Sequence, residues 1–524
     1  VSGVKIKNKR PLDFMAVTDH SEYMGVHPTL KDPNGPFAAT DAGKAVLSGD
    51  PKRIQEELMK IMWTIATNPP TPIPELVDPG FRSKAWQTYV DLADKYYKPG
   101  EFTTLVAYEW TSIPDQRNLH RNVIFRGTNV PDIPFSSMDS QDPEDLWNWM
   151  DKVRTEGDDV LAIPHNSNVS DGLMFGLKDS YGQALTAEYA DVRMRNEPVV
   201  EMTQIKGTSE THPALSVDDE WADFEILEEL LGGNKFSKPK GSYTRDAFKD
   251  GILMQAEQNF NPYKFGQLGA SDSHNSSVPV EESNYTGKIG HLDGTPKARL
   301  GGGWISAHNF KYSAAGLAGI WASENTREAI FDAMKAKQVF ATSGPRIDLV
   351  MAGGSGLPAA VPADGVNLHA DDVVFMGGDL PTGDGVKLYL QASRDALSAP
   401  LQRMQIIKGW VQDGQTHEKV YDVACSEGEP NPQTHRCADN GATIDTKTCE
   451  ISEANGAAQL ATVWTDPDFN ADQHAFYYAR VLENPSCRWS TWDSIREGSE
   501  IPKGAPLTIQ ERAWSSPLWY TPSS

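Results

Sequence analysis

Short apolar runs alternate with segments of helical periodicity through the first 345 residues of the chain. The apolar runs predict strands at 12–17, 104–108, 160–163, 198–200 and 266–270. Apolar residues at helical spacing predict helices at 51–67, 82–97, 143–157, 220–231 and 326–337, the last of them capped by Asn325. This alternation indicates an α/β fold whose functional loops follow the C-terminal ends of parallel strands.

The pattern changes after Gly344 and Pro345. Short alternating strands, such as 386–390 and 475–481, are separated there by turns rich in Gly, Asp and Pro. We therefore predict two domains, an α/β barrel-like domain over residues 1–345 and a β-sandwich-like domain over residues 346–524.

Each of the five predicted strands in the first domain runs into a carboxylate or an imidazole. Strand ends of this kind place their side chains at one rim of a parallel sheet, where barrel enzymes gather their chemistry. Imidazole nitrogen and carboxylate oxygen together suit zinc, manganese or iron. The sequence therefore predicts a multinuclear metal centre, with candidate ligands Asp19, His20, Glu109, His165, Glu201, Asp272 and His274.

The local spacing separates stronger candidates from weaker ones. Asp272 and His274 are alternate residues, so in an extended segment both side chains point the same way. Asp19 and His20 are neighbours and diverge, so His20 is the expected ligand, while Asp19 orients an imidazole or binds a separate ion. For Glu201 a solvated loop position is the alternative, and any one histidine alone can be a core or capping residue.

Cations lie close to these clusters in the sequence. Lys206, Arg121 and Arg346 are expected to hold the anionic oxygens of an oxyacid ester, with charged surface positions as the alternative. His120, in the polar cluster 118–122, is expected to protonate the leaving oxygen.

Composition and charge narrow the class of protein. A hydrophobic fraction of 39% argues against disorder, and the net charge of −24 is spread along the chain, which argues against nucleic acid or an anionic membrane as a partner. No apolar run approaches the roughly 20 residues of a transmembrane helix. The first ten residues lack the apolar core of a signal peptide, so we expect a soluble chain whose sequence begins after a processed or cropped segment.

The four cysteines, at positions 425, 437, 449 and 487, all lie in the β-rich part. Their spacing matches no zinc motif, and we predict two disulfides formed in an oxidising compartment, periplasmic or extracellular. Three pairings are open, and free buried thiols are the alternative.

Several of these segments resemble successive motifs of the PHP superfamily, named for polymerase and histidinol phosphatase domains. They are Phe14–His20, Glu109, Pro164–His165, Ser271–His274 and the segment 339–344. The whole chain is similar to a large bacterial branch of that superfamily, which joins a PHP-like barrel to a C-terminal β-rich region. The segments 108–111, 118–125, 204–210 and 464–467 carry this second resemblance.

The resemblance implies a distorted barrel of seven strand–helix units that binds two or three Zn, Mn or Fe ions. It assigns His20, Glu109, His165, Asp272 and His274 as ligands, with Glu109 bridging two ions. One motif departs from the family's pattern, because the His-x-His of the first strand has no counterpart upstream of Asp13. We expect that first strand to precede this sequence; the alternative is that the folded chain has lost the strand and that one metal position is incomplete.

Taken together, these features predict a metal-dependent hydrolase of small anionic esters, most simply a phosphoesterase that uses a metal-activated hydroxide. Two alternatives stay open. The same centre could cleave a carbonyl or sulfate ester. Alternatively, the chain is a secreted, non-catalytic binding protein on a degenerate barrel. An aromatic run near the C-terminus would then form the ligand-binding platform: Trp489, Trp492, Trp514, Trp519 and Tyr520. The sequence leaves homo-oligomerisation open.

Overall fold

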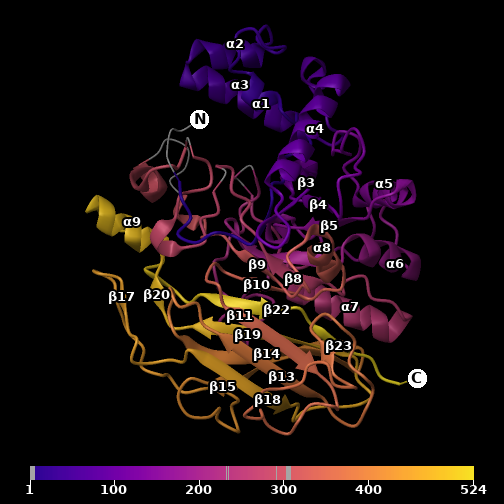
Figure 1. The fold of residues 1–524 in the computed structure, drawn as a ribbon, viewed down its shortest axis with the longest axis vertical. Coiled ribbons are helices and arrows are strands. Elements are labelled where there is room, and N and C mark those ends of the chain that lie inside the picture. The colour runs from indigo at the N-terminus through magenta and orange to yellow at the C-terminus, as the bar shows by residue number, and fades with distance from the viewer. Residues whose placement is uncertain are drawn as a thin grey trace.

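The computed structural model describes residues 6–523, except 232, 234, 276, 291 and 303–308. The expectation about the start of the chain falls largely on residues 1–5 and lies outside the described residues. Figure 1 shows a mixed α/β fold, with helices α1 to α4 at one end and the strands of the C-terminal part at the other. The helices are α1 Val26–Thr29, α2 Asp41–Ser48, α3 Pro51–Ile65, α4 Pro79–Tyr96, α5 Pro143–Glu156, α6 Ala187–Asn196, α7 Thr244–Gln258, α8 Arg327–Lys335 and α9 Trp489–Glu497.

Four of the five predicted helices are confirmed as α3, α4, α5 and α8. In α4 the Asp78 side chain accepts a hydrogen bond from the backbone N–H of Phe81, and Pro79 occupies the first turn, where no N–H is needed. The cap of α8 is Thr326, one residue later than expected, because the Asn325 amide donates to the backbone carbonyl of Asp13 instead.

The predicted helix at 220–231 is wrong. The segment consists of turns and an isolated bridge, and Glu225 has a left-handed backbone with φ of 43°. Its apolar residues serve tertiary packing, since Leu227 and Leu230 are buried in one small cluster with Val169.

All five predicted strands of the first part are confirmed, although their directions differ from the expectation. They are β1 Phe14–Ala16, β2 Thr103–Leu105 with β3 Ala107–Trp110, β5 Val160–Pro164, β6 Val199–Gln204 and β8 Gly266–Gly269. The pairs β1–β2 and β6–β8 are parallel. In contrast, β4 (Arg121–Phe125) runs antiparallel to both β3 and β5, because residues 111–120 are too few for the crossover that parallel strands require.

These strands form short separate sheets, β1–β2, β3–β4–β5 and β7–β6–β8, where β7 is Gly207–Thr208. Strands β9 (Leu317–Ile320) and β10 (Val339–Thr342) join a sheet of the C-terminal part instead. Across the described ranges the strands close no barrel, and the seven-unit barrel stays a prediction. The domain division at residue 345 is likewise a prediction, because β10 pairs with β22 (Arg512–Ser515) across it.

The C-terminal part contains a seven-stranded sheet and a four-stranded sheet. The larger has the order β15-β14-β19-β22-β10-β9, with β23 beside β19, and its members are β14 Leu401–Gln412, β15 Gln415–Cys425, β19 Ala475–Glu483 and β23 Leu518–Tyr520. The smaller has the order β12-β11-β13-β18, with β11 Asp348–Gly353, β12 Val374–Phe375, β13 Lys387–Ser393 and β18 Gln459–Thr465.

Alternate residues of β19 face opposite layers, as a pleated strand requires. Tyr477 and Ala479 share a core with the four-stranded sheet, whereas Phe476 and Tyr478 pack toward α7. The Phe248 ring of α7 lies 5.5 Å from that of Phe476, measured between centroids. The large sheet is therefore covered by a helix of the first part on one side and by the small sheet on the other.

The aromatic run near the C-terminus belongs to the core rather than to an exposed platform. Trp489, Trp514, Trp519 and Tyr520 are buried, and Trp492 is half-buried. This burial removes one of the two observations that favoured the binding-protein alternative; the other, the missing His-x-His motif, is unaffected.

A buried ion cluster joins the first part to the C-terminal sheet. Arg245 of α7 donates to Asp219 at 2.8 Å and to Glu210 at 2.5 Å, and Arg480 of β19 donates to Asp219 at 2.7 Å and to Glu210 at 3.2 Å. All four side chains are almost completely buried. Two guanidinium groups and two carboxylates thus balance in charge inside the protein.

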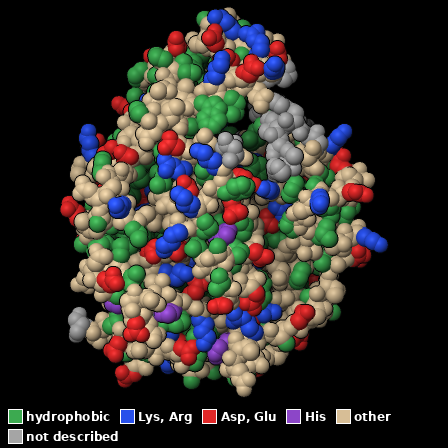
Figure 2. Space-filling view, turned by 180° about the vertical axis from the view of Figure 1, so that it is seen from behind, with side chains coloured by type: hydrophobic (Ala, Val, Ile, Leu, Met, Phe, Trp, Pro, Cys, Tyr) green, Lys and Arg blue, Asp and Glu red, His purple; other side chains and the backbone are tan. Residues whose placement is uncertain are grey.

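Two disulfides, Cys425–Cys437 and Cys449–Cys487, pair all four cysteines. They close segments of 12 and 38 residues in the C-terminal part. Within the described part of the chain, no helix is long and apolar enough to cross a bilayer. Figure 2 shows Lys and Arg interspersed with Asp and Glu on the face drawn there.

Removing one member of the ion cluster should destabilise the fold strongly. Arg480→Met leaves the two buried carboxylates, Glu210 and Asp219, with the single guanidinium of Arg245, and we expect the free energy of unfolding to fall by about 3–5 kcal/mol. Arg126→Met is the matched control, because the Arg126–Asp332 pair is 38% and 56% exposed and should contribute only about 0–1 kcal/mol. Denaturant unfolding measures both, and equal losses would contradict the role of the cluster.

Alkylation tests the disulfides. Unfolded protein that has not been reduced should take up no iodoacetamide, whereas reduction should expose all four cysteines to the reagent. Mass spectrometry counts the labels, and labelling before reduction would show that a bridge is absent.

Candidate metal centre

Glu109 is the centre of the site, and backbone pairing brings His20 beside it. The N–H of Glu109 donates to the carbonyl of Asp19 at 2.9 Å, and the N–H of Ser21 donates to the carbonyl of Glu109 at 2.8 Å. This parallel bridge extends beyond β1 and places His20 Nδ1 3.2 Å from Glu109 Oε2. Thr111 Oγ1 also lies 2.5 Å from His20 Nδ1.

The antiparallel strand β4 supplies a second histidine. His120 immediately precedes β4, and His165 immediately follows β5, so the antiparallel pairing brings both residues to the same end of the sheet. His120 Nδ1 is 2.6 Å and His165 Nε2 is 3.1 Å from Glu109 Oε1. Ligand atoms of these three buried residues lie within 4.8 Å of one another, which is close enough to share a metal ion.

Asp272 and His274 follow β8 and extend the group. The ring centroids of His274 and His20 are 5.5 Å apart, those of His20 and His120 6.3 Å, and those of His120 and His165 5.5 Å. The four rings therefore form a continuous row.

We predicted that Asp272 and His274 face the same way because they alternate along an extended segment, and this reason is wrong. Asp272 has a left-handed backbone, with φ of 48°, rather than an extended one. The two side chains nevertheless converge, with His274 Nδ1 3.6 Å from Asp272 Oδ1. Strained backbone conformations of this kind concentrate at functional sites.

Lys206, Lys288 and Asn166 hold the Asp272 carboxylate. Lys206 Nζ donates to Asp272 Oδ2, and the same oxygen accepts from Lys288 Nζ and Asn166 Nδ2, each at 3.2 Å. Burial alone would raise the pKa of Asp272, but the two ammonium groups outweigh it and hold that pKa well below its usual range. Asp272 is therefore ionised and fixed in orientation.

The protonation states of Glu109, His120 and His274 suit the binding of a cation. Burial alone would raise the pKa of Glu109, but the imidazoles of His20 and His120 outweigh it and hold this pKa well below the usual value. Burial lowers the pKa of His120 to about 4. The charge of Lys288, together with burial, lowers the pKa of His274 to about 3. Neutral imidazole and ionised carboxylate are the forms that ligate metals. His165 differs, because burial alone would lower its pKa but the Glu109 carboxylate outweighs burial and raises it, so a metal ion there would displace its proton.

The hydrogen-bond geometry of the histidines also fits a bound metal ion. Within the described residues neither ring nitrogen of His120 makes a well-aligned hydrogen bond, although Nδ1 lies 2.6 Å from Glu109 Oε1, so a cation would complete the polar contacts of this buried ring. His274 Nδ1 lies 3.0 Å from the carbonyl of Asp272. A histidine that donates Nδ1–H to a carbonyl presents Nε2 to a metal.

Three of the residues predicted for the site have their partners elsewhere. Tyr89 donates a hydrogen bond to Asp19, and burial, together with this contact, raises the pKa of the Tyr89 phenol. Arg121 is buried against Glu197 at 2.9 Å. The Arg346 side chain donates to the backbone carbonyl of Pro11.

Glu201 lies within β6, not at the end of the strand, and is buried near His165 and Asp272. Among the described residues its Oε2 has no hydrogen-bond partner, and burial raises the pKa of Glu201 to about 7. Lys288 is a site residue that the sequence did not reveal, because it lies in a loop without strand or helix periodicity.

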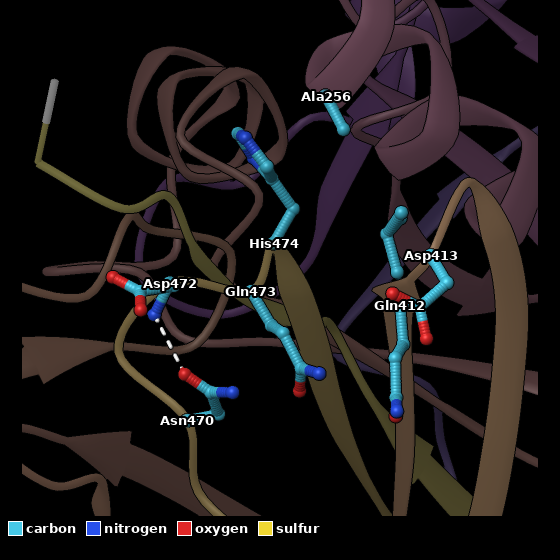
Figure 3. A pocket seen from close by; sticks show the side chains of 8 residues that line it. Ala256, Gln412, Asp413, Asn470, Asp472, Gln473 and His474 are labelled. Atoms are coloured by element: carbon cyan, nitrogen blue, oxygen red, sulfur yellow. Dashed lines mark hydrogen bonds between the residues drawn. The ribbon is translucent and has the colours of Figure 1, made fainter.

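A separate open pocket, of about 360 Å³, lies at the far end of β14 (Figure 3). Gln412, Asp413, Asn470, Asp472 and His474 line it, and none of the predicted site residues does.

The geometry thus defines a mixed α/β protein with a buried carboxylate–imidazole group able to hold a metal ion. The chain belongs to the family described as "Protein of unknown function (DUF3604)", whose model matches residues 1–522. No curated protein and no solved structure matches the chain.

Glu109→Gln tests the centre directly. The substitution keeps the shape of the side chain but removes the charge that three imidazoles surround, so we expect loss of most of the bound transition metal. Elemental analysis of purified protein measures the loss, with circular dichroism to confirm folding. His369→Ala, at an exposed position, is the control and should keep its metal; equal metal in both variants would exclude Glu109 as a ligand.

Proposed function

We propose that this protein is a metal-dependent hydrolase of anionic esters, most simply a phosphoesterase. The observation that carries the proposal is the contact of one buried carboxylate, Glu109, with three imidazoles from separate segments. The adjoining Lys206–Asp272 pair supports it by adding a cation where an anionic substrate needs one.

The ligand set of the proposal is His20, Glu109, His120, His165, Asp272 and His274. Glu109 Oε1 faces His120 and His165, whereas Oε2 faces His20, so the two oxygens point toward different imidazoles. This division suits a carboxylate shared by two ions, as the resemblance to the PHP superfamily implies. Two or three Zn, Mn or Fe ions bound there would act as Lewis acids and lower the pKa of a coordinated water.

The residues of the chain itself would orient the substrate and exclude water. His20 and His274 side chains are about one-third exposed, whereas Glu109, His120 and His165 are buried, so substrate enters from the His20–His274 side. Lys206 binds a non-bridging oxygen. His120 is assigned as a ligand rather than as the acid, because its Nδ1 lies 2.6 Å from Glu109 Oε1 and its ligand atoms lie close to those of His165.

The proposal includes the finer architecture. Residues 1–345 would form a distorted PHP-like barrel, and residues 346–524 a β-sandwich-like domain. The two disulfides support an oxidising compartment, periplasmic or extracellular. A sulfate ester is the second candidate substrate, because the two ammonium groups at Asp272 would bind its oxygens as well.

Asp272→Ala tests the proposed activity. The wild type should hydrolyse an aryl phosphate, lose that activity on chelation and recover it when Mn or Zn is returned. The variant should lose at least about two orders of magnitude in kcat/KM, as when one group that stabilises transition-state charge is removed.

Asp384→Ala, at an exposed loop position, is the control and should match the wild type. Turnover that persists after chelation, or in Asp272→Ala with normal metal content, would contradict the proposal. A parallel assay with an aryl sulfate separates the two candidate substrates.

A further inference from the structure

Lys288 is held in a defined position beside the candidate centre. Its Nζ lies 2.8 Å from the carbonyl of Asp272, 3.2 Å from Asp272 Oδ2 and 3.2 Å from His274 Nδ1. Its backbone N–H donates to Asp293 Oδ2 at 2.7 Å, which anchors the loop. The side chain is only 4% exposed, so it is not a mobile surface lysine.

Lys206 and Lys288 converge on one oxygen atom. Both ammonium groups contact Asp272 Oδ2, and the Asn166 amide donates to the same atom. Two positive charges thus face a single carboxylate in a buried setting, where an unbalanced charge is costly unless a partner neutralises it. Of the other carboxylates of the group, Glu109 is already surrounded by imidazoles, and Glu201 is buried near Asp272 and Lys206.

Both lysines keep N–H groups for a ligand. An ammonium group has three donors. Within the described residues, the hydrogen bonds of Lys206 Nζ go to Asp272 Oδ2, which leaves two donors. When His274 donates its Nδ1–H to the Asp272 carbonyl, Lys288 has one donor left.

The lysine pair lies beside the open side of the centre. Solvent reaches the group at His20 and His274, whose side chains are 33% and 34% exposed. Lys288 contacts His274, so this buried ammonium group lies directly behind one of the two partly exposed rings.

We propose that Lys288 is a substrate-binding residue that, together with Lys206, selects dianionic phosphate monoesters over monoanionic diesters; this inference rests on the proposed function. Each ammonium group takes one non-bridging oxygen of a terminal phosphate. A diester carries one charge fewer and places a carbon substituent on one of the oxygens that the lysine pair would bind.

Lys288→Met removes the charge and keeps the length of the side chain. Losing one charge-assisted hydrogen bond should weaken binding of inorganic phosphate roughly ten- to hundredfold, as measured by calorimetry on the metal-loaded protein. The kcat/KM for an aryl phosphate monoester should fall by a similar factor, while that for a methyl aryl phosphate diester changes less than about threefold. Metal content should stay at the wild-type level.

Two further variants complete the test. Lys288→Arg keeps the charge and should keep most of the preference for the monoester. Lys297→Met removes an exposed lysine nearby in the sequence and should leave every measurement unchanged.

Equal losses on both esters accompanied by loss of metal would show that Lys288 only positions Asp272, and would overturn the inference. Unchanged phosphate binding in Lys288→Met would overturn it as well. Absence of any hydrolysis by the wild type would instead reject the proposed function, and the phosphate-binding comparison would still decide the role of Lys288.

Discussion

The candidate site depends on the contact between the buried Glu109 carboxylate and the imidazoles of His20, His120 and His165. A buried carboxylate without partners would take up a proton or destabilise the fold. Here the imidazoles hold its pKa well below the ordinary value, so the charge persists inside the protein. The same contacts leave His120 without aligned hydrogen bonds. A cation would satisfy both the carboxylate and the rings.

Strand pairing explains how residues far apart in the sequence reach Glu109. The parallel bridge beyond β1 supplies His20, and the antiparallel β3–β4–β5 sheet brings the start of β4 and the end of β5 together. The large C-terminal sheet supports this arrangement through β10 and α7. The buried cluster of Arg245, Arg480, Glu210 and Asp219 joins the two parts electrostatically, so the site rests on a scaffold that spans the chain.

Much of the site could be predicted because buried strands that end in His, Asp or Glu leave a clear local signal. That signal is present at His20, Glu109, His165, Asp272 and His274, and the structure brings these residues together.

The direction of β4 could not be inferred from the sequence, because it depends on tertiary pairing. For this reason the sequence assigned His120 a different role. Segment 220–231 has an apolar pattern that serves tertiary packing rather than a helix. Lys288 lies in an irregular loop, where no strand or helix periodicity indicates that a lysine is buried. Arg121 and Arg346 were placed by proximity in sequence, but their side chains contact Glu197 and the backbone carbonyl of Pro11 instead.

The central claim is that Glu109 and its imidazoles bind metal, and anomalous diffraction from crystals grown with Mn or Zn tests it most directly. The account predicts an anomalous peak within bonding distance of Glu109, His120 and His165, with a second peak on the His20 side of the carboxylate. A map without a peak at Glu109, from crystals of folded protein saturated with the metal, would contradict it.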